Sequence, residues 1–133
     1  MKLGYTIVYV KDPRRTAEFW SRAFGLEQRP MDDSPMYREM ETGTHTLAFV
    51  AHSYIRETLP GGFRAAQNDE APPPFEIALT TDDVAAALQR AVKAGAHHVM
   101  APKQKPWGQT VAYVRDCDGN LVELCTPMGR LPA

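Results

Sequence analysis

The sequence predicts an α+β protein of two βαβββ modules, whose mixed sheets curl around a cavity. Two observations carry this prediction: a strand that runs into an aspartate-capped helix occurs twice, and each copy is followed by strands alone. Half of the chain would bury little apolar surface by itself, whereas 133 residues suit one ordinary domain. Each sheet is therefore expected to cover its helix with one face and to help enclose a cavity with the other.

The internal repeat is clearest at the start of each half. Residues 5–12 read Tyr-Thr-Ile-Val-Tyr-Val-Lys-Asp, and residues 76–83 read Glu-Ile-Ala-Leu-Thr-Thr-Asp-Asp. A glycine follows the last aspartate after 13 residues in the first copy (Gly25) and after 12 in the second (Gly95). The alternative explanation is a coincidence between two ordinary strand–helix units. The repeat predicts a single domain, with module one at about 1–59, a linker at about 60–74 and module two at about 75–133.

Local signals place the elements of the first module. Residues 3–10 are rich in β-branched and aromatic side chains, which favours a strand. Asp12 and Pro13 predict a helix start, because aspartate caps free N–H groups and proline needs no donor there. The apolar stripe of that helix has helical spacing: Ala17, Trp20, Ala23 and Phe24. Residues 36–41 and 45–52 are expected to form two further strands.

The second module repeats this order after a long segment without regular patterning. Residues 53–74 contain Pro60-Gly61-Gly62 and three consecutive prolines, so a long loop or linker is expected. Asp83 caps the next predicted helix and Gly95 ends it. The last two strands flank a glycine-containing hairpin turn at residues 116–120. Strands are predicted at 75–80, 97–100, 110–114 and 121–125.

Composition and charge exclude several classes of protein. Lysine and arginine number 15 against 16 acidic residues, so the chain has no global electrostatic reason to bind nucleic acid. No apolar run is long enough for a membrane span, and the first residues lack the apolar core of a signal peptide. Cys117 and Cys125 form neither a disulfide framework nor a thiolate zinc motif. These features are typical of a cytoplasmic protein.

The sequence resembles the vicinal oxygen chelate superfamily, which includes glyoxalases, bleomycin-resistance proteins, fosfomycin-resistance enzymes and extradiol dioxygenases. The resemblance covers essentially the whole chain. Its most specific piece is the Asp-x-Asp-Gly-Asn-x-x-Glu-Leu segment at residues 116–124, which says little about the reaction. The matching segments are Val10-Lys11-Asp12, Phe19-Trp20, Phe24-Gly25-Leu26, Glu76–Asp83 with Gly95, Trp107-Gly108 and Arg115–Leu124.

The resemblance implies paired modules around a shared cavity and, in some members, a divalent metal. Such members draw their ligands, mostly His, Glu or Gln, from the first and last strands of each module. Those positions fall on Tyr5, near Ala48, on Glu76 and on Glu123, and Glu123 alone is a usual ligand type for its place. Transition metals are held well by imidazole, which both first-strand positions lack. The expectation is therefore no metal cofactor, with a divalent metal as the alternative.

Strand alternation gives an independent reason to place these side chains on one surface. Residues of a strand point alternately to its two faces, and the apolar set of each strand belongs beneath a helix. The opposite set should then face the cavity: Tyr5, Ile7 and Tyr9 in one strand, Glu76, Ala78 and Thr80 in another, and Leu121, Glu123 and Cys125 in the last. Alternation by itself does not distinguish a cavity from open solvent.

These residues suggest what the site would hold. Glu76 and Glu123 favour a cationic or hydroxyl-bearing ligand, and as a close pair they could raise each other's pKa and supply a general base. His52 could be a third metal ligand, or a strand-end histidine near solvent. Trp107 could wall the mouth, or pack between the modules. The other expected ligand contacts are Tyr5, Tyr9, Tyr113 and Cys125.

Three functions remain in view. The leading interpretation is a metal-independent protein that binds a small aromatic or cationic organic molecule, in the manner of antibiotic-sequestering resistance proteins. The resemblance also implies a homodimer. The second interpretation is a divalent-metal-dependent lyase, isomerase or dioxygenase-like enzyme, with Glu76 and Glu123 as catalytic residues and with His52 completing the metal ligands. The third is a partner-binding protein without chemistry of its own.

Overall fold

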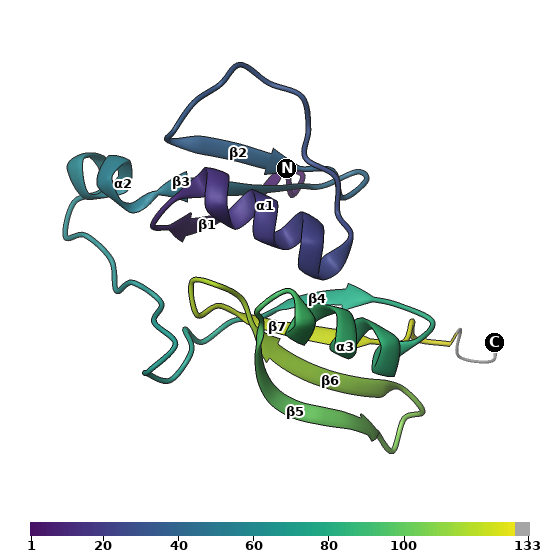
Figure 1. Ribbon diagram of the computed structural model, residues 1–133. Coiled ribbons are helices and arrows are strands. Elements are labelled where there is room, and N and C mark those ends of the chain that lie inside the picture. Colours follow the sequence, from purple (N-terminus) through teal and green to yellow (C-terminus); the bar gives the residue numbers. More distant parts are fainter. Residues whose placement is uncertain (130–133) are drawn as a thin grey trace. The chain divides into compact units, whose positions relative to one another are not determined.

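The chain divides into two compact units, and the boundary lies between Ala66 and Gln67. In the computed structural model, which describes residues 1–129, each unit has its own sheet and a helix packed on it (Figure 1). The boundary falls within the proline-rich segment expected at 60–74. The α+β class and the two βαβββ-like modules with mixed sheets are confirmed.

The first unit builds a three-stranded sheet in the order β1-β3-β2. Strand β1 runs parallel to β3, and β2 runs antiparallel to it. The strand that would complete the module is reduced to one bridge between Gln28 and Met40. The elements are β1 (Tyr5–Val10), α1 (Pro13–Phe24), β2 (Tyr37–Met40), β3 (Thr46–Ala51) and α2 (His52–Thr58).

Helix α1 forms as its sequence signals predict. Asp12 accepts hydrogen bonds from the backbone N–H groups of Arg14 and Arg15, and Gly25 ends the helix with a φ of 72°. Trp20 of its apolar stripe reaches the sheet, because its ring lies 5.5 Å from that of Phe49 on β3. The core of the first unit therefore lies between α1 and its sheet.

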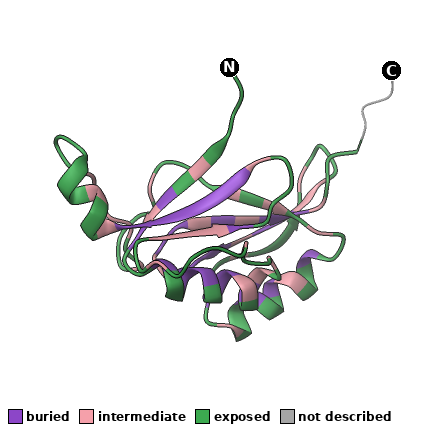
Figure 2. Ribbon diagram, turned by 90° about the horizontal axis from the view of Figure 1, so that it is seen from above, coloured by how far each residue is buried: buried purple, intermediate pink, exposed green. Residues whose placement is uncertain are grey.

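Helix α2 replaces what was expected to be the end of a strand and the start of a loop. Strand β3 ends at Ala51, and the seven residues from His52 form a helix in which no residue is buried (Figure 2, the segment that projects at the left). The sequence predicted a strand at 45–52 and a loop at 53–74. Both predictions are wrong within residues 52–58, which form this helix. An exposed helix has no apolar stripe, so its sequence carries no helical periodicity to detect.

The second unit repeats the topology with all of its strands present. Its sheet has the order β4-β7-β6-β5, with β4 parallel to β7. Helix α3 starts at an Asp83 cap, as expected, and packs on β5, β6 and β7. Strand β5 is twice as long as predicted and carries two register irregularities. The elements are β4 (Ile77–Thr80), α3 (Val84–Lys93), β5 (His97–Gln104), β6 (Thr110–Arg115) and β7 (Leu121–Cys125).

The turn between β6 and β7 anchors the segment that leads into the second unit. The buried Arg115 guanidinium donates to the carbonyl oxygens of Gly119 (2.7 and 2.9 Å), Gln67 (2.6 Å) and Glu70. Asn68 donates through Nδ2 to the Asp116 carbonyl oxygen at 3.2 Å. Residues 67–70 are thus attached to the turn by two side chains; we call them the clamped segment.

None of the helices within residues 1–129 has the length and apolarity that crossing a membrane requires.

Candidate functional site

A cluster of titratable side chains lies on the face of the second sheet opposite α3. Glu123 is at the centre of β7, where its register partners are Ala78 on β4 and Tyr113 on β6. Its neighbours along β7, Val122 and Leu124, are buried on the other face. Glu76 directly precedes β4 and interacts with both Glu123 and Tyr113. We call Glu76, Tyr113, Glu123 and Cys125 the carboxylate cluster.

Three members of the cluster, Tyr113, Glu123 and Cys125, have raised pKa values. Burial raises the pKa of Glu123 most, and a hydrogen bond with Glu76 and the charge of that carboxylate raise it further. The Lys105 charge and a hydrogen bond with Cys125 act in the opposite direction. Because a neighbouring carboxylate disfavours a second negative charge, the protonated form of Glu123 is favoured.

The pKa values of Tyr113 and Cys125, which lie next to the two carboxylates, are raised as well. Burial raises the pKa of the Tyr113 phenol, and the charges of Glu123 and Glu76 raise it further. Burial also raises the pKa of the Cys125 thiol, again with help from both carboxylates. A thiol under these influences stays protonated, so Cys125 is unsuited to act as a thiolate nucleophile.

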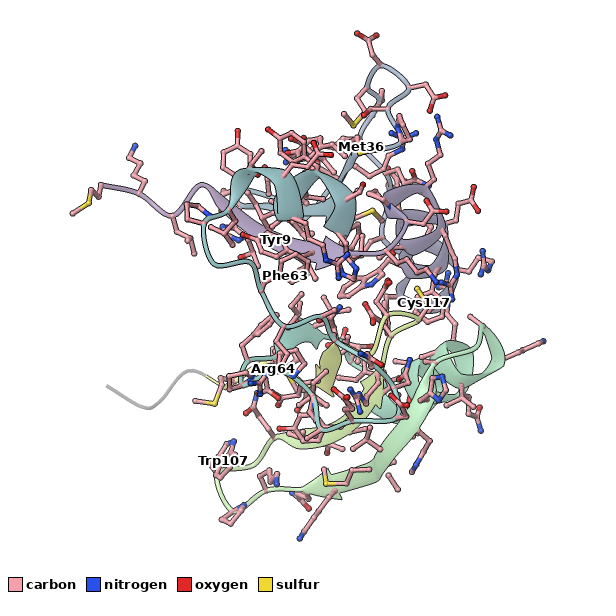
Figure 3. The ribbon with its side chains drawn as sticks, turned by 90° about the vertical axis from the view of Figure 1, so that its left-hand side faces the viewer. Tyr9, Met36, Phe63, Arg64, Trp107 and Cys117 are labelled. Atoms are coloured by element: carbon pink, nitrogen blue, oxygen red, sulfur yellow. The ribbon has the colours of Figure 1, made fainter. Side chains whose placement is uncertain are left out.

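Tyr5 and Tyr9 belong to the first unit and lie on the face of β1 opposite α1. Tyr5 and Ile7 are about half exposed, at 58% and 48%, whereas Val8 and Val10 are buried, so the strand alternates as predicted. The Tyr9 ring lies 5.1 Å from the ring of Phe63 (Figure 3). The structure thus groups these two tyrosines on one unit and the carboxylate cluster on the other.

Trp107 lies in the hairpin turn between β5 and β6 (Figure 3). Its side chain is 62% exposed, and its Nε1–H donates to Gln109 Oε1 at 2.8 Å. Lys105 Nζ lies 6.0 Å from the centre of the indole ring. Gly108 takes a φ of 102°, which this turn requires and glycine supplies. The wall role that the sequence suggested for Trp107 stays a prediction.

His52 is not on a strand. It is the first residue of α2, so the prediction that it ends the strand at 45–52 is wrong. Its Nε2 lies 3.2 Å from the Tyr9 carbonyl oxygen and must donate, because a carbonyl only accepts. Its ring also lies 5.1 Å from that of Phe63. In this arrangement Nε2 has no lone pair to offer a metal.

Comparison with known proteins identifies the family. The model of the Glyoxalase/Bleomycin resistance protein/Dioxygenase superfamily matches residues 2–124. The chain belongs to this superfamily. The resemblance found in the sequence is therefore confirmed. A search of curated proteins found no significant match.

Solved structures of the superfamily share the fold. One is a glyoxalase-related enzyme from Fulvimarina pelagi, with a TM-score of 0.80, 20% identity, and coverage of 100% of this chain and 96% of that one. A second, described as a family enzyme from Burkholderia phytofirmans PsJN, has a TM-score of 0.79, 20% identity, and coverage of 95% and 98%. A third, from Nocardioides, has a TM-score of 0.74, 17% identity, and coverage of 99% and 90%. Identities this low show the fold alone.

The side chains at the positions where some members of the superfamily bind a metal are poor metal ligands in this chain. Among residues 1–129, no three His, Cys, Asp or Glu side chains form a group that could hold a metal ion. Of the four carried-over positions, Ala48 is fully buried and has no donor, and Tyr5 offers a phenol. The remaining two, Glu76 and Glu123, are carboxylates, and the surroundings of Glu123 favour its protonated form. This set does not fit a tightly bound transition metal, which favours imidazole or thiolate ligands.

The sequence reasoning missed a polar network on the first sheet. The Tyr37 hydroxyl donates to Glu39 at 2.7 Å, and Arg29 reaches Glu39 at 3.5 Å and the Thr46 hydroxyl at 2.6 Å. Burial raises the pKa of Tyr37, and the hydrogen bond and charge of Glu39 raise it further. The period-two spacing of Tyr37 and Glu39 was a signal that could have placed both side chains on one face of β2. Arg29 carried no such signal, because it lies outside any strand.

Proposed function

We propose that the chain binds a small organic molecule, cationic or hydroxyl-bearing and with an aromatic part, through the carboxylate cluster and without a metal. The observation that carries the proposal is the meeting of Glu76 and Glu123 beside Tyr113 on one sheet face. The same cluster supports neither a nucleophile nor a tight metal site. Its chemistry is that of an anionic patch with an aromatic neighbour.

Physical chemistry favours a cation at this place. The pKa of Glu123 is raised because its charge is partly desolvated and faces a second carboxylate. A ligand ammonium or amidinium group would relieve both penalties, since an opposite charge favours the ionised form of each carboxylate. A ligand hydroxyl could donate to the same oxygens. The Tyr113 ring adds a surface on which an aromatic portion can pack.

The proposal includes sequestration rather than turnover. An antibiotic with a cationic group and an aromatic part would be a ligand of this kind. Bleomycin resistance is part of the description of the superfamily. Trp107 is the further aromatic side chain that we propose contacts the ligand.

A second candidate function is proton transfer. The raised pKa of Glu123 brings that carboxyl closer to neutral pH, where a general acid or base is most effective. An isomerase or lyase that moves a proton with Glu123 would use this property directly. Its metal-dependent version would in addition need a divalent ion bound through Glu76 and Glu123.

The first experiment compares the wild-type protein with Glu123→Gln and with Glu18→Gln, an exposed glutamate on α1 that serves as the matched control. Metal content is measured, Zn²⁺, Ni²⁺, Mn²⁺ and Mg²⁺ are titrated by calorimetry, and organic cations are then screened by thermal shift. We expect no stoichiometric metal, and we expect cations that stabilise the wild type and Glu18→Gln but not Glu123→Gln. Stoichiometric metal binding lost in Glu123→Gln would instead support the metal-dependent enzyme.

A further inference from the structure

Phe63 occupies a position that three other side chains surround. Its ring lies beside Tyr9 (Figure 3) and meets it edge-on, with centroids 5.1 Å apart and planes at 70°. It also lies 5.1 Å from the His52 ring. The Arg56 guanidinium lies 5.0 Å from the ring centre. Strand β1 supplies Tyr9, and α2 supplies the other two side chains. The hydrogen bond from His52 to the Tyr9 carbonyl fixes the imidazole against that strand.

The segment that carries Phe63 is lightly held. Gly61 and Gly62 precede it with φ values of 79° and 67°, and each has open space where a side chain would be. Helix α2, which supplies two of the surrounding side chains, buries no residue. The core of the first unit lies on the α1 side of the sheet, around Trp20 and Phe49. Phe63 can therefore leave its place without disturbing that core.

We propose that Tyr9, His52 and Arg56 form a slot for a single aromatic ring that carries a negative charge, such as an aryl carboxylate or a phenolate. Phe63 is the resident occupant, and the incoming ring displaces it. The two rings offer the edge and face contacts that aromatic groups prefer. Arg56 stacks on an aromatic face and pairs with an anionic substituent, which selects the charge of the ligand.

This slot is separate from the proposed function. It lies on the first unit, takes an anion rather than a cation, and uses neither carboxylate. Because the chain fills its own slot, the apparent affinity for a ligand is reduced by the fraction of molecules in which Phe63 has moved out. Phe63 thus raises the ligand concentration that is needed to fill the slot, so weakly binding aromatic compounds do not occupy it.

The test is a titration with sodium benzoate, followed through the backbone amide NMR signals of Tyr9 and His52. Benzylammonium chloride, a ring of similar size and opposite charge, is titrated in parallel. We expect Phe63→Ala to bind benzoate about tenfold more tightly than the wild type or better, because the competing ring is gone. We expect benzylammonium to bind neither protein measurably, and Arg56→Gln added to Phe63→Ala to abolish benzoate binding.

Two control variants make the result specific. Phe75→Ala removes an exposed phenylalanine of the second unit and should keep the wild-type affinity for benzoate. Glu123→Gln should keep it as well, which separates this proposal from the one for the carboxylate cluster. Equal benzoate affinity of Phe63→Ala and the wild type, or equal affinity for benzoate and benzylammonium, would overturn the proposal.

A further measurement needs no variant and so does not depend on the folding of Phe63→Ala. Saturating benzoate should move the ring-proton signals of Phe63 in the wild-type chain, because the ring leaves the neighbourhood of Tyr9 and His52. Unchanged signals of Phe63 at saturation would show that no displacement occurs, and would overturn the proposal in the same way.

Discussion

Glu123 differs from an ordinary strand glutamate in how its charge is surrounded. It is part-buried on β7, beside a second carboxylate and a phenol, and the charge of Lys105 and a hydrogen bond with Cys125 favour its ionisation. The folded chain therefore binds the Glu123 proton more tightly than the unfolded chain does. That difference makes this residue a source of pH-dependent stability.

The first prediction follows from the sign of this shift. A pKa raised by folding contributes stability that is full below the unfolded value, about 4.3 for glutamate, and is lost as pH rises through the folded value. We therefore expect the free energy of unfolding of the wild type to fall, relative to that of Glu123→Gln, as pH rises from about 4.3. Urea denaturation at a series of pH values measures this difference.

Glu76→Gln provides the matched comparison, because Glu76 supplies a hydrogen bond and a charge that raise the pKa of Glu123. This variant should retain the part of the pH dependence that burial causes and lose the rest. Parallel pH profiles for the wild type and Glu123→Gln would contradict the raised pKa of Glu123, and parallel profiles for the wild type and Glu76→Gln would show that the carboxylate pair does not interact as described.

At the scale of elements, the β6–β7 turn explains the most specific motif of the sequence. Asp116 Oδ1 accepts hydrogen bonds from the backbone N–H groups of Asp118 and Asn120, both at 2.9 Å, which shapes the turn. Gly119 has a φ of 94°, and its missing side chain leaves room for the clamped segment. The motif is therefore needed for architecture, which is why it indicates the superfamily and says little about chemistry.

The second prediction concerns Gly119→Ala. A Cβ at this position would lie 2.6 Å from the Gln67 carbonyl carbon and 2.9 Å from Asn68 N, in addition to the strain of a left-handed backbone. We expect a loss of about 2–4 kcal/mol in the free energy of unfolding. Gly108→Ala is the control, since its φ of 102° is similar but its surroundings are open, and it should cost about 1–2 kcal/mol. Equal losses would contradict the close approach of the clamped segment.

The elements that the sequence predicts well are those with local signals. Helix α1 has a cap, a stripe and a terminating glycine within 14 residues, and each signal acts on neighbouring backbone. Helix α2 has no stripe, so periodicity could not reveal it, and the error at His52 follows from that omission. Strand alternation placed Glu123 and Cys125 on the face opposite Val122 and Leu124, because alternation is a property of the strand itself.

What the sequence could not predict depends on contacts between distant segments. Part of the rise in the pKa of Glu123 comes from Glu76, which is 47 residues away in the sequence. The contacts of Phe63 with Tyr9 and His52 depend on where an irregular segment folds back, and no periodic pattern records that path. The partners of Arg115 are carbonyl oxygens, which every residue type possesses, so residue identity gave no hint of them.

At the scale of the whole molecule, the segment that connects the units has two parts, and hydrogen bonds to the second unit hold the backbone of one of them. Residues 59–66 hold no helix or strand, and their Gly61 and Gly62 are exposed. The clamped segment beyond them is tied to the second unit by Arg115 and Asn68. The two parts should therefore differ in how readily their backbone opens.

The third prediction is a pattern of limited proteolysis. Proteinase K should cut within residues 59–66 well before it cuts within 67–70, because a protease needs an unrestrained backbone. Arg115→Ala should allow early cleavage at 67–70 as well, and mass spectrometry of the fragments would locate the cuts. Asp33→Ala, which removes ion pairs with Arg14 and Arg38 at the surface of the first unit, is the control and should leave the pattern unchanged. Early cleavage at 67–70 in the wild type would contradict the clamp.

The fourth prediction concerns assembly. The superfamily resemblance in the sequence implies a homodimer, and each unit presents a sheet face opposite its helix. We expect a species of roughly twice 14.8 kDa in sedimentation velocity. A single species at the mass of one chain, unchanged over a hundredfold range of protein concentration, would rule the homodimer out.

The parallel pairing of the first and last strands in each unit has a consequence for how the protein is made. Val122 is synthesised 45 residues after its register partner Ile77, which at ordinary translation rates is a delay of about 2–9 s. Strand β7 lies between β4 and β6, so until it emerges from the ribosome β4 lacks its partner and β6 lacks one of its two neighbours. The first unit has all of its strands by Ala51, well before the second unit can close. The nascent chain thus passes through a period in which its first half has all of its strands and its second half has an unpaired β4 and an open edge on β6, and a chaperone would matter most then.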